Sequence, residues 1–128
     1  MKAVILAAGE GVRMRPLTLK KPKPLLELAG KSLLHHIWEL LPNKINEVIL
    51  VVGYKARMIK KYLGKSFLGK KIVYVHQKTK KGTADALFLA KPYLNPKEKF
   101  LLLYADDLHD KKVLKDACKL SGGFWYVP

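Results

Sequence analysis

Residues 3–24, AVILAAGEGVRMRPLTLKKPKP, are the stretch around which the fold is organised. They begin with a short apolar run, Ala3–Leu6, which predicts a fully buried strand. Gly9 and Gly11 follow as the backbone leaves that strand, and two arginines and three lysines come within the next dozen positions. Glycines let successive backbone N–H groups close on an anion, because no Cβ holds the ligand away. The stretch therefore predicts a strand that leads into a loop suited to a polyphosphate.

Outside this stretch, apolar runs and helical patterns alternate along the chain. Three further strands are predicted over Val48–Val52, Ile72–Val75 and Phe100–Tyr104. The three prolines between residues 16 and 24 predict an extended or turned chain, without helix, over Leu17–Pro24. Helices are predicted over four segments: Leu33–Leu41 capped by Ser32, Tyr54–Leu63, Ala84–Ala90 capped by Thr83, and Val113–Leu120.

Four alternations of strand and helix predict an α/β protein, with residues 1–128 as a single nucleotide-binding domain. The expected architecture is a Rossmann-like, doubly wound and mainly parallel sheet. In the strand order 3-2-1-4, the first and fourth strands are neighbours, and ligands bind beyond the carboxyl ends of the strands at that switch point. Asp106 follows the fourth strand. We therefore expect Asp106 and the loop Gly9–Lys23 to meet at one crevice.

The formal net charge of +15 has two interpretations. Basic clusters bind nucleic acid, but these lysines are dispersed without interleaved aromatic residues, which disfavours an RNA or DNA groove. A lysine-rich surface with few Asn and Gln residues is instead typical of a thermophile. No apolar run approaches the roughly 20 residues of a membrane helix, and no signal peptide is recognisable, so a cytoplasmic protein is expected. The single Cys118 is expected to be a buried small hydrophobic residue.

Two segments, LAAGEGVRMRPLT and KPKPLLELAGKSLL, resemble the opening motif of the sugar-phosphate nucleotidylyltransferases. These enzymes join a nucleoside triphosphate to a sugar 1-phosphate and release pyrophosphate, and they have the nucleotide-diphospho-sugar transferase fold. Val12 replaces the threonine that is usual in this motif, and Glu27-Leu28 replaces a common Pro-Val or Pro-Ile. The resemblance reaches about Leu120 but covers only the N-terminal part of a usual family member. It implies a truncated form of that fold.

The resemblance also implies roles for individual residues. Arg13 and Lys23 match the catalytic cations of the family, which bind the α-phosphate and the departing or incoming phosphates. Their alternative interpretation is that of solvated surface cations. Asp106 matches the carboxylate that binds Mg²⁺, although Ala105 replaces the glycine that usually precedes it. The implied nucleotide-binding set is Leu6, Ala7, Ala8, Gly9, Gly11, Arg13, Lys23, Gln77, Gly82 and Thr83.

Gln77 is the only glutamine of the chain, and the sequence from Gln77 to Leu87 resembles the family's Gln…Gly-Thr-Ala-x-Ala motif. In that family the glutamine and the glycine backbone bind the edge of the base. An amide carries both a donor and an acceptor, as uracil or thymine recognition requires. UTP or dTTP is therefore the expected substrate. A surface glutamine beside a strand is the alternative interpretation.

Two functions remain open from the sequence. One is a sugar-phosphate nucleotidylyltransferase, acting as a homo-oligomer or with a second chain. The other is a truncated, non-catalytic nucleotide-binding remnant. The tail 121–128, SGGFWYVP, does not resemble the continuation that the family would have. It is expected either to pack its aromatic residues on the open edge of the sheet or to be the product of a frameshift or premature stop.

Overall fold

The computed structural model describes residues 1–79 and 81–120. The predicted tail 121–128 lies outside the described residues. The strands are β1 (Lys2–Ala7), β2 (Glu27–Leu28), β3 (Lys31–Ser32), β4 (Glu47–Val52), β5 (Ser66–Phe67), β6 (Lys70–His76) and β7 (Phe100–Tyr104). The helices are α1 (Leu17–Lys20), α2 (Leu33–Leu40), α3 (Ala56–Leu63), α4 (Thr83–Ala90) and α5 (Lys111–Ala117), and the 3-10 turns are η1 (Val12–Met14), η2 (Lys23–Leu25) and η3 (Lys91–Tyr93).

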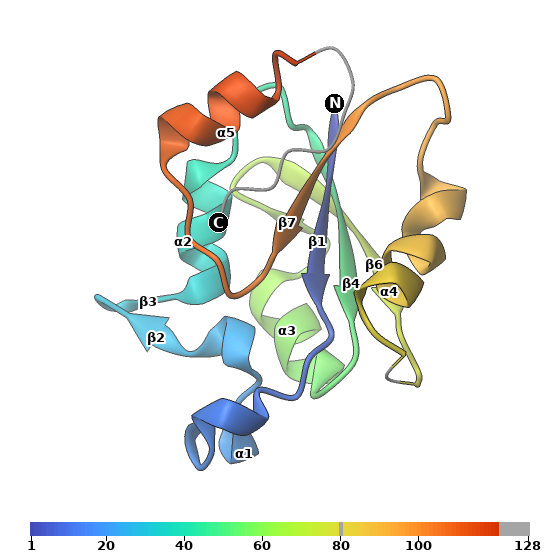
Figure 1. Cartoon of the computed structure of the whole chain (residues 1–128). Helices are drawn as coiled ribbons and strands as arrows, with labels where there is room; N and C mark the ends of the chain where they lie inside the picture. The colour runs from blue at the N-terminus through green and yellow to red at the C-terminus, as the bar shows by residue number, and fades with distance from the viewer. Residues whose placement is uncertain (80, 121–128) are drawn as a thin grey trace.

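One sheet of five strands carries the fold, in the order β5-β6-β4-β1-β7. The strands β6, β4, β1 and β7 are parallel, and only the short β5 is antiparallel to its neighbour. Without β5, this is the predicted order 3-2-1-4, and the Rossmann-like fold is confirmed. β1 lies between β4 and β7, so that Ile5 is in register with Leu50 of β4 and with Leu103 of β7. Figure 1 shows these strands ending at the same edge of the sheet.

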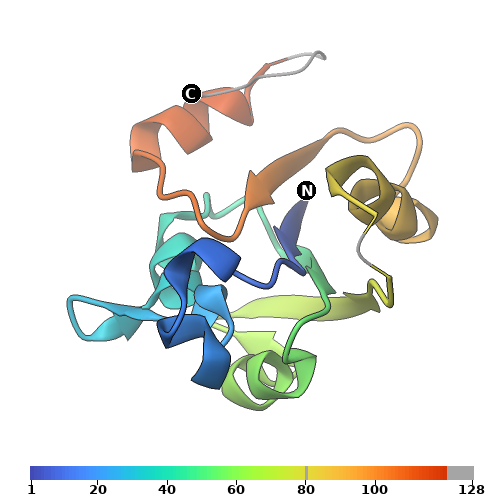
Figure 2. The ribbon, with the colours of Figure 1, turned by 60° about the horizontal axis from the view of Figure 1, so that its bottom comes forward.

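Helices cover both faces of the sheet, as a doubly wound fold requires. The larger core cluster lies between one face and the helices α2, α3 and α5, around the fully buried Trp38. The smaller cluster lies between the other face and α4, where Ala86 and Ala90 pack on Val4 and its neighbours. Successive residues of β1 point to opposite faces, which is why Ile5 and Val4 belong to different clusters. Figure 2 shows α4 on the side of the sheet opposite to α2 and α3.

The prediction that Leu17–Pro24 contains no helix is wrong. Residues Leu17–Lys20 form the single turn α1, and Lys23–Leu25 form η2. Proline is compatible with the start of a helix, where its missing N–H has no intrahelical partner, and Pro16 and Pro22 are the N-caps of these two turns. Lys21, which precedes Pro22, is extended, so that α1 ends after one turn.

Other boundaries differ by a few residues. Ser32 caps α2 as predicted, its Oγ accepting a hydrogen bond from the backbone N–H of His35. The cap of α4 is Gly82 and not Thr83, which is the first helical residue and makes no capping hydrogen bond. Helix α5 begins earlier than predicted, because Asp110 accepts a hydrogen bond from the backbone N–H of Lys112 and fixes its start. The hairpin of β2 and β3 and the short β5 were not predicted, although a two-residue loop that ends in Gly joins the strands in both cases, Ala29-Gly30 and Leu68-Gly69.

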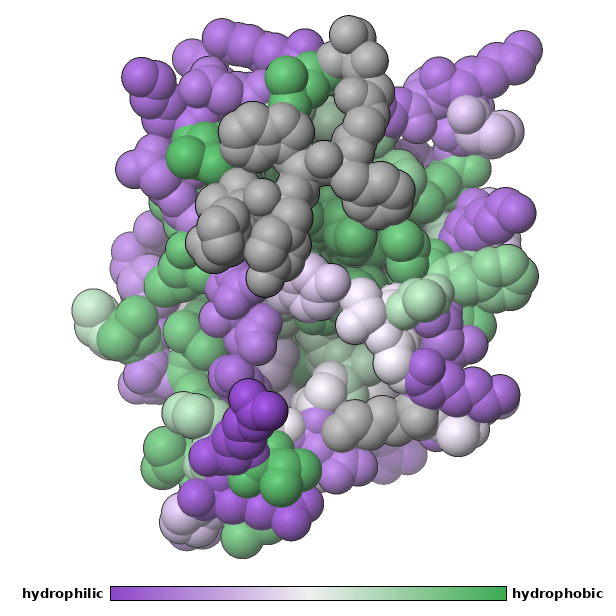
Figure 3. Space-filling view, viewed as in Figure 1, coloured by the Kyte–Doolittle hydropathy of each residue, from purple (hydrophilic) through white to green (hydrophobic). Residues whose placement is uncertain are grey.

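The single cysteine and the surface bear on three further predictions. Cys118 is buried, as predicted, and burial raises the pKa of its thiol. Within residues 1–79 and 81–120, no helix has the length and apolar character to cross a membrane. On the face seen in Figure 3, hydrophilic side chains are spread around the margin with hydrophobic ones between them. The cytoplasmic location and thermophilic source stay predictions.

Candidate active site

The loop after β1 takes its shape from Gly11. This residue has a φ of +62°, a conformation that side chains other than glycine rarely adopt. A Cβ there would lie 2.7 Å from Cγ2 of Thr18 and 3.2 Å from Cβ of Lys23. The fully buried Thr18 donates a hydrogen bond to the carbonyl of Gly11 over 2.7 Å, and the hydroxyl of Tyr54 donates to the carbonyl of Thr18 over 2.7 Å. The loop is therefore fixed by Thr18 of α1 and, through Thr18, by Tyr54, which lies two residues before α3.

The residues that follow β1, β4 and β6 lie close together at Gly53. A Cβ on Gly53 would lie 3.1 Å from the carbonyl oxygen of Ala8 and 3.2 Å from that of Gln77. Beyond the strands the ladder continues, because Gln77 N–H donates to Val52 and Ala105 N–H donates to Leu6. These contacts bring the segments after β1, β6 and β7 to one edge. Figure 2 brings this edge toward the viewer, with the segment after β1 on one side of it and α4 on the other.

A cavity of about 280 Å³ opens at this edge. Of the eleven residues predicted for the site, ten line it: Leu6, Ala7, Ala8, Gly9, Gly11, Lys23, Gln77, Gly82, Thr83 and Asp106. The expected meeting of the Gly9–Lys23 loop with Asp106 is therefore confirmed as geometry. Binding of a nucleotide by these residues stays a prediction.

Arg13 is the predicted site residue that does not line the cavity. It lies in the turn η1 with an exposed side chain. Its neighbour Arg15, also exposed, forms an ion pair with Glu10 over 3.7 Å. The catalytic role of Arg13 stays a prediction.

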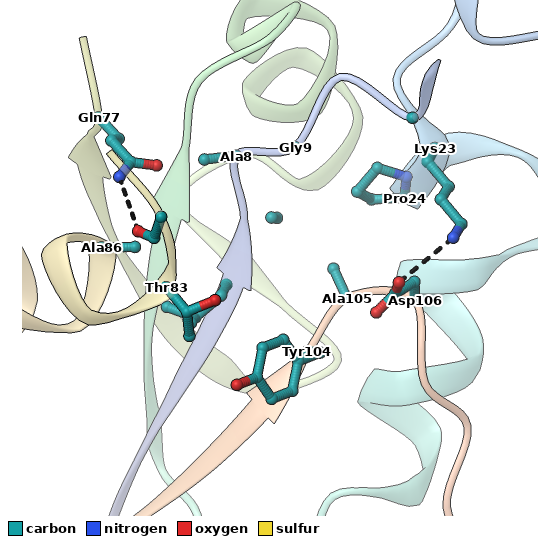
Figure 4. A pocket seen from close by; sticks show the side chains of 14 residues that line it. Ala8, Gly9, Lys23, Pro24, Gln77, Thr83, Ala86, Tyr104, Ala105 and Asp106 are labelled. Atoms are coloured by element: carbon teal, nitrogen blue, oxygen red, sulfur yellow. Dashed lines mark hydrogen bonds and ion pairs between the residues drawn. The ribbon is translucent and has the colours of Figure 1, made fainter. Parts of the chain in front are cut away.

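Lys23 and Asp106 contact each other across the mouth of the cavity. The Nζ of Lys23 donates to Oδ2 of Asp106 over 3.2 Å (Figure 4). Both side chains are partly exposed, 32% for Lys23 and 47% for Asp106. An ion pair between exposed partners contributes little to stability, about 0–1 kcal/mol. The lysine and the carboxylate are therefore easily separated by a phosphate or a cation that binds either of them.

Gln77 is buried, but its amide is not free in the way that the sequence predicts. Its Nε2 donates to the carbonyl of Gly82 over 3.2 Å and to Oδ2 of Asp85 over 3.0 Å. The expectation that Gln77 offers a base both a donor and an acceptor is therefore wrong in its donor part, because the protein already uses the NH₂ group. The amide oxygen remains, and Figure 4 shows it pointing away from the Gly82 bond, toward Ala8.

The family model for nucleotidyl transferases matches residues 2–121. The chain belongs to the nucleotidyl transferase family. A curated relative, the mannose-1-phosphate guanylyltransferase catalytic subunit beta of Dictyostelium discoideum, is 45% identical over 86% of this chain and 32% of its own length. The UTP–glucose-1-phosphate uridylyltransferase AglF of Haloferax volcanii is 38% identical over 84% of this chain and 44% of its own length. The chain thus spans less than half the length of these relatives.

A solved structure confirms the fold. The inositol-1-phosphate CTP transferase from T. maritima aligns with a TM-score of 0.78 and 33% identity, over 91% of this chain and 47% of that one. The names of these three proteins refer to different nucleotides: guanylyl, uridylyl and CTP.

Several residues at the cavity were not predicted from the sequence. Pro24, Ala86, Tyr104 and Ala105 line it, and Asp85 holds the amide of Gln77. Ala105 had a signal, because it directly precedes Asp106 at the end of a strand. Asp85 had none, because it lies at the variable position of the Gly-Thr-Ala-x-Ala motif.

Metal-ligating groups near the cavity are few. Among the described residues, no three His, Cys, Asp or Glu side chains gather as they would at a metal site made by protein alone. His35 of α2 pairs with Glu39 over 2.9 Å, and His36 contacts the carbonyl of Leu28. Asp106 supplies one hard oxygen ligand beside the cavity. One carboxylate fits Mg²⁺, which keeps several waters and takes further oxygens from substrate phosphates.

Proposed function

We propose that this chain binds a nucleoside triphosphate in the cavity and takes part in transferring its nucleotidyl group to a sugar 1-phosphate, with release of pyrophosphate. The observation that carries the proposal is the convergence of three parts of the chain on one cavity: the loop after β1, the residues Gln77, Gly82 and Thr83, and Asp106. Cations, bare backbone and a buried amide are the groups that phosphates and a base require. Membership of the nucleotidyl transferase family supports the same conclusion.

The reaction would be an in-line displacement. An oxygen of the sugar phosphate attacks the α-phosphorus, the bond from that phosphorus to the bridging oxygen breaks, and pyrophosphate leaves with the electron pair. Such chemistry depends mainly on alignment and charge neutralisation. Lys23, whose Nζ reaches the mouth of the cavity, would neutralise the α-phosphate. Arg13, placed on the adjacent turn, would fold onto the leaving phosphates.

Asp106 is the residue that would hold Mg²⁺. When bound, the ion would neutralise charge on the phosphate oxygens. Lys23 would be released from Asp106 in the same event, and its ammonium would become free to donate to a phosphate. A lone carboxylate binds Mg²⁺ weakly, so we expect appreciable binding only when a triphosphate is present.

The base is proposed to be uracil or thymine. Gln77 presents an oxygen acceptor, and the N3–H of uracil or thymine is a matching donor. Guanine also carries a ring N–H, at N1, and the 45% identical relative is named a guanylyltransferase, so GTP is the second candidate. Cytosine and adenine have an unprotonated ring nitrogen at the corresponding position and would place an acceptor against an acceptor.

Binding of the four nucleoside triphosphates tests this proposal. Thermal unfolding of the 128-residue chain would be followed with UTP, dTTP, GTP or ATP in the presence of Mg²⁺. We expect UTP and dTTP to raise the melting temperature more than ATP, at moderate and at high salt. Equal shifts from all nucleotides that disappear in salt would mean nonspecific attraction to a surface of charge +15, and would contradict the proposal.

Turnover separates an active enzyme from a non-catalytic remnant. Pyrophosphate release would be measured with UTP and a panel of sugar 1-phosphates. Because the chain spans less than half of its relatives, we expect weak nucleotide binding and very slow turnover from the isolated chain. Turnover that rises steeply with protein concentration would support a homo-oligomer or second chain that completes the site. Turnover of about 1 per second or faster from a monomer would contradict the expectation that the isolated chain needs further residues to complete the site.

A further inference from the structure

The side-chain amide of Gln77 has a defined orientation in this protein. Both of its partners, the carbonyl of Gly82 and the carboxylate of Asp85, can only accept hydrogen bonds. The NH₂ end must therefore face them, because the reverse orientation would set the amide oxygen against two other oxygens. Gln77 is 9% exposed, so water does not readily replace these contacts. The orientation is thus set by the surrounding network.

Asp85 is the partner that can fix this orientation from a rigid position. It lies in the first turn of α4, and the next residue, Ala86, is 3% exposed and packs on the sheet. The carbonyl of Gly82 is shared, because it also accepts the helical hydrogen bond from Ala86 N–H. The stronger contact for the amide is therefore the one to Asp85, at 3.0 Å to a charged acceptor.

A purely structural role for Asp85 makes a different prediction from a positioning role. A carboxylate in the first turn stabilises a helix through its charge. That stabilisation would be lost in Asp85→Asn and in Asp85→Ala alike. A hydrogen bond to the amide of Gln77 needs only an oxygen acceptor, which Asn retains and Ala lacks.

We propose that Asp85 is a positioning residue that holds the amide of Gln77 with its oxygen toward the cavity, and so makes the site select bases that present a ring N–H. Those bases are uracil, thymine and guanine, and the disfavoured ones are cytosine and adenine. The inference rests on the proposed function, because it assumes that a base binds beside Gln77. The orientation of the amide itself does not depend on that assumption.

The first experiment needs no nucleotide. Gln77 is the only glutamine in the chain, so selective ¹⁵N labelling of glutamine side chains gives a single NH₂ pair in an NMR spectrum. In the unmodified chain we expect slowed hydrogen exchange of that pair. Loss of one charged acceptor in Asp85→Ala is expected to speed exchange about tenfold, whereas Asp85→Asn should stay within about twofold. Unchanged exchange in Asp85→Ala, or exchange typical of a free glutamine in the unmodified chain, would overturn the proposal.

The second experiment measures base selectivity with UTP and CTP, which differ only at the pairing edge of the base. We expect the unmodified chain and Asp85→Asn to favour UTP about tenfold or more. In Asp85→Ala the amide gains freedom to rotate, and the ratio should fall toward unity. An equal loss of affinity for both nucleotides would show a merely structural role. If UTP binds well and the ratio is the same in all three proteins, positioning by Asp85 fails while the proposed function stands. If neither nucleotide binds, the proposed function fails, and the selectivity part of the inference fails with it.

Discussion

The two sides of the cavity are built differently. The side proposed to bind the base, here the base side, consists of Gln77, Gly82 and Asp85. Gln77 is only 9% exposed, and two hydrogen bonds within the protein hold its amide. The side proposed to bind the phosphates, here the phosphate side, consists of the loop Gly9–Lys23 with Asp106, and its charged groups are partly exposed or exposed. Its one contact between predicted site residues is the ion pair of Lys23 and Asp106. The base side is preorganised, and the phosphate side still has to be organised by the ligand.

This difference has a consequence for substitutions. Charged groups on the phosphate side contribute little to folding and should affect binding or turnover without affecting stability. Gly11 lies in the same loop, but the fold itself fixes its conformation: its φ is positive, and its carbonyl accepts a hydrogen bond from Thr18. A substitution of Gly11 should therefore affect stability. Substitutions can therefore separate what the ligand organises from what the fold organises.

The largest effect is expected from Arg13→Ala, measured as the rate of pyrophosphate release under conditions that give turnover. Removal of one donor that stabilises charge in the transition state lowers turnover by roughly two to three orders of magnitude. Arg15→Ala is the matched control, because Arg15 is exposed, lies two positions away and pairs with Glu10. Comparable losses from the two variants would contradict the assignment of Arg13.

A smaller effect is expected from Lys23→Ala, measured as the affinity for UTP with Mg²⁺. Loss of a charge-assisted hydrogen bond to phosphate should weaken binding about tenfold to a hundredfold. The free energy of unfolding should change by no more than about 1 kcal/mol, since the ion pair with Asp106 is exposed. Lys21→Ala, also exposed, should leave the affinity within about twofold. An equal loss from Lys21→Ala would indicate general attraction to the basic surface.

The smallest effect concerns stability, and it compares two glycines of the same loop. Gly11→Ala should lower the free energy of unfolding by about 1–3 kcal/mol, because of its positive φ and the contact with Thr18. At Gly9 an added Cβ meets no atom within 4 Å. Gly9→Ala should therefore leave stability within about 0.5 kcal/mol while weakening UTP binding, since Gly9 lines the cavity. Chemical denaturation and calorimetric binding measure the two quantities. Similar stability losses would mean that the loop shape does not depend on Gly11.

Much of the phosphate side could be predicted from the sequence, because its motif is contiguous. Gly9, Gly11 and Lys23 lie within one stretch, and the topology of the sheet then brings Asp106 to it. The fold was predictable for a similar reason, since each parallel strand is a short apolar run with a helix after it. What the sequence could not give was the pairing of side chains across elements. The bond from Gln77 to Asp85 depends on how α4 packs on the sheet, and the exposure of Arg13 depends on the turn η1.

The central claim is that a nucleoside triphosphate binds between these two sides, and a titration followed by NMR tests it most directly. Backbone amides of the ¹⁵N-labelled 128-residue chain would be recorded while UTP and Mg²⁺ are added. We expect the largest shifts at Ala8, Gly9, Gly11, Thr83 and Ala105, together with the side-chain NH₂ of Gln77, all saturating at one concentration. Shifts that spread over the lysine-rich surface without saturating, and that leave these residues unchanged, would contradict the claim.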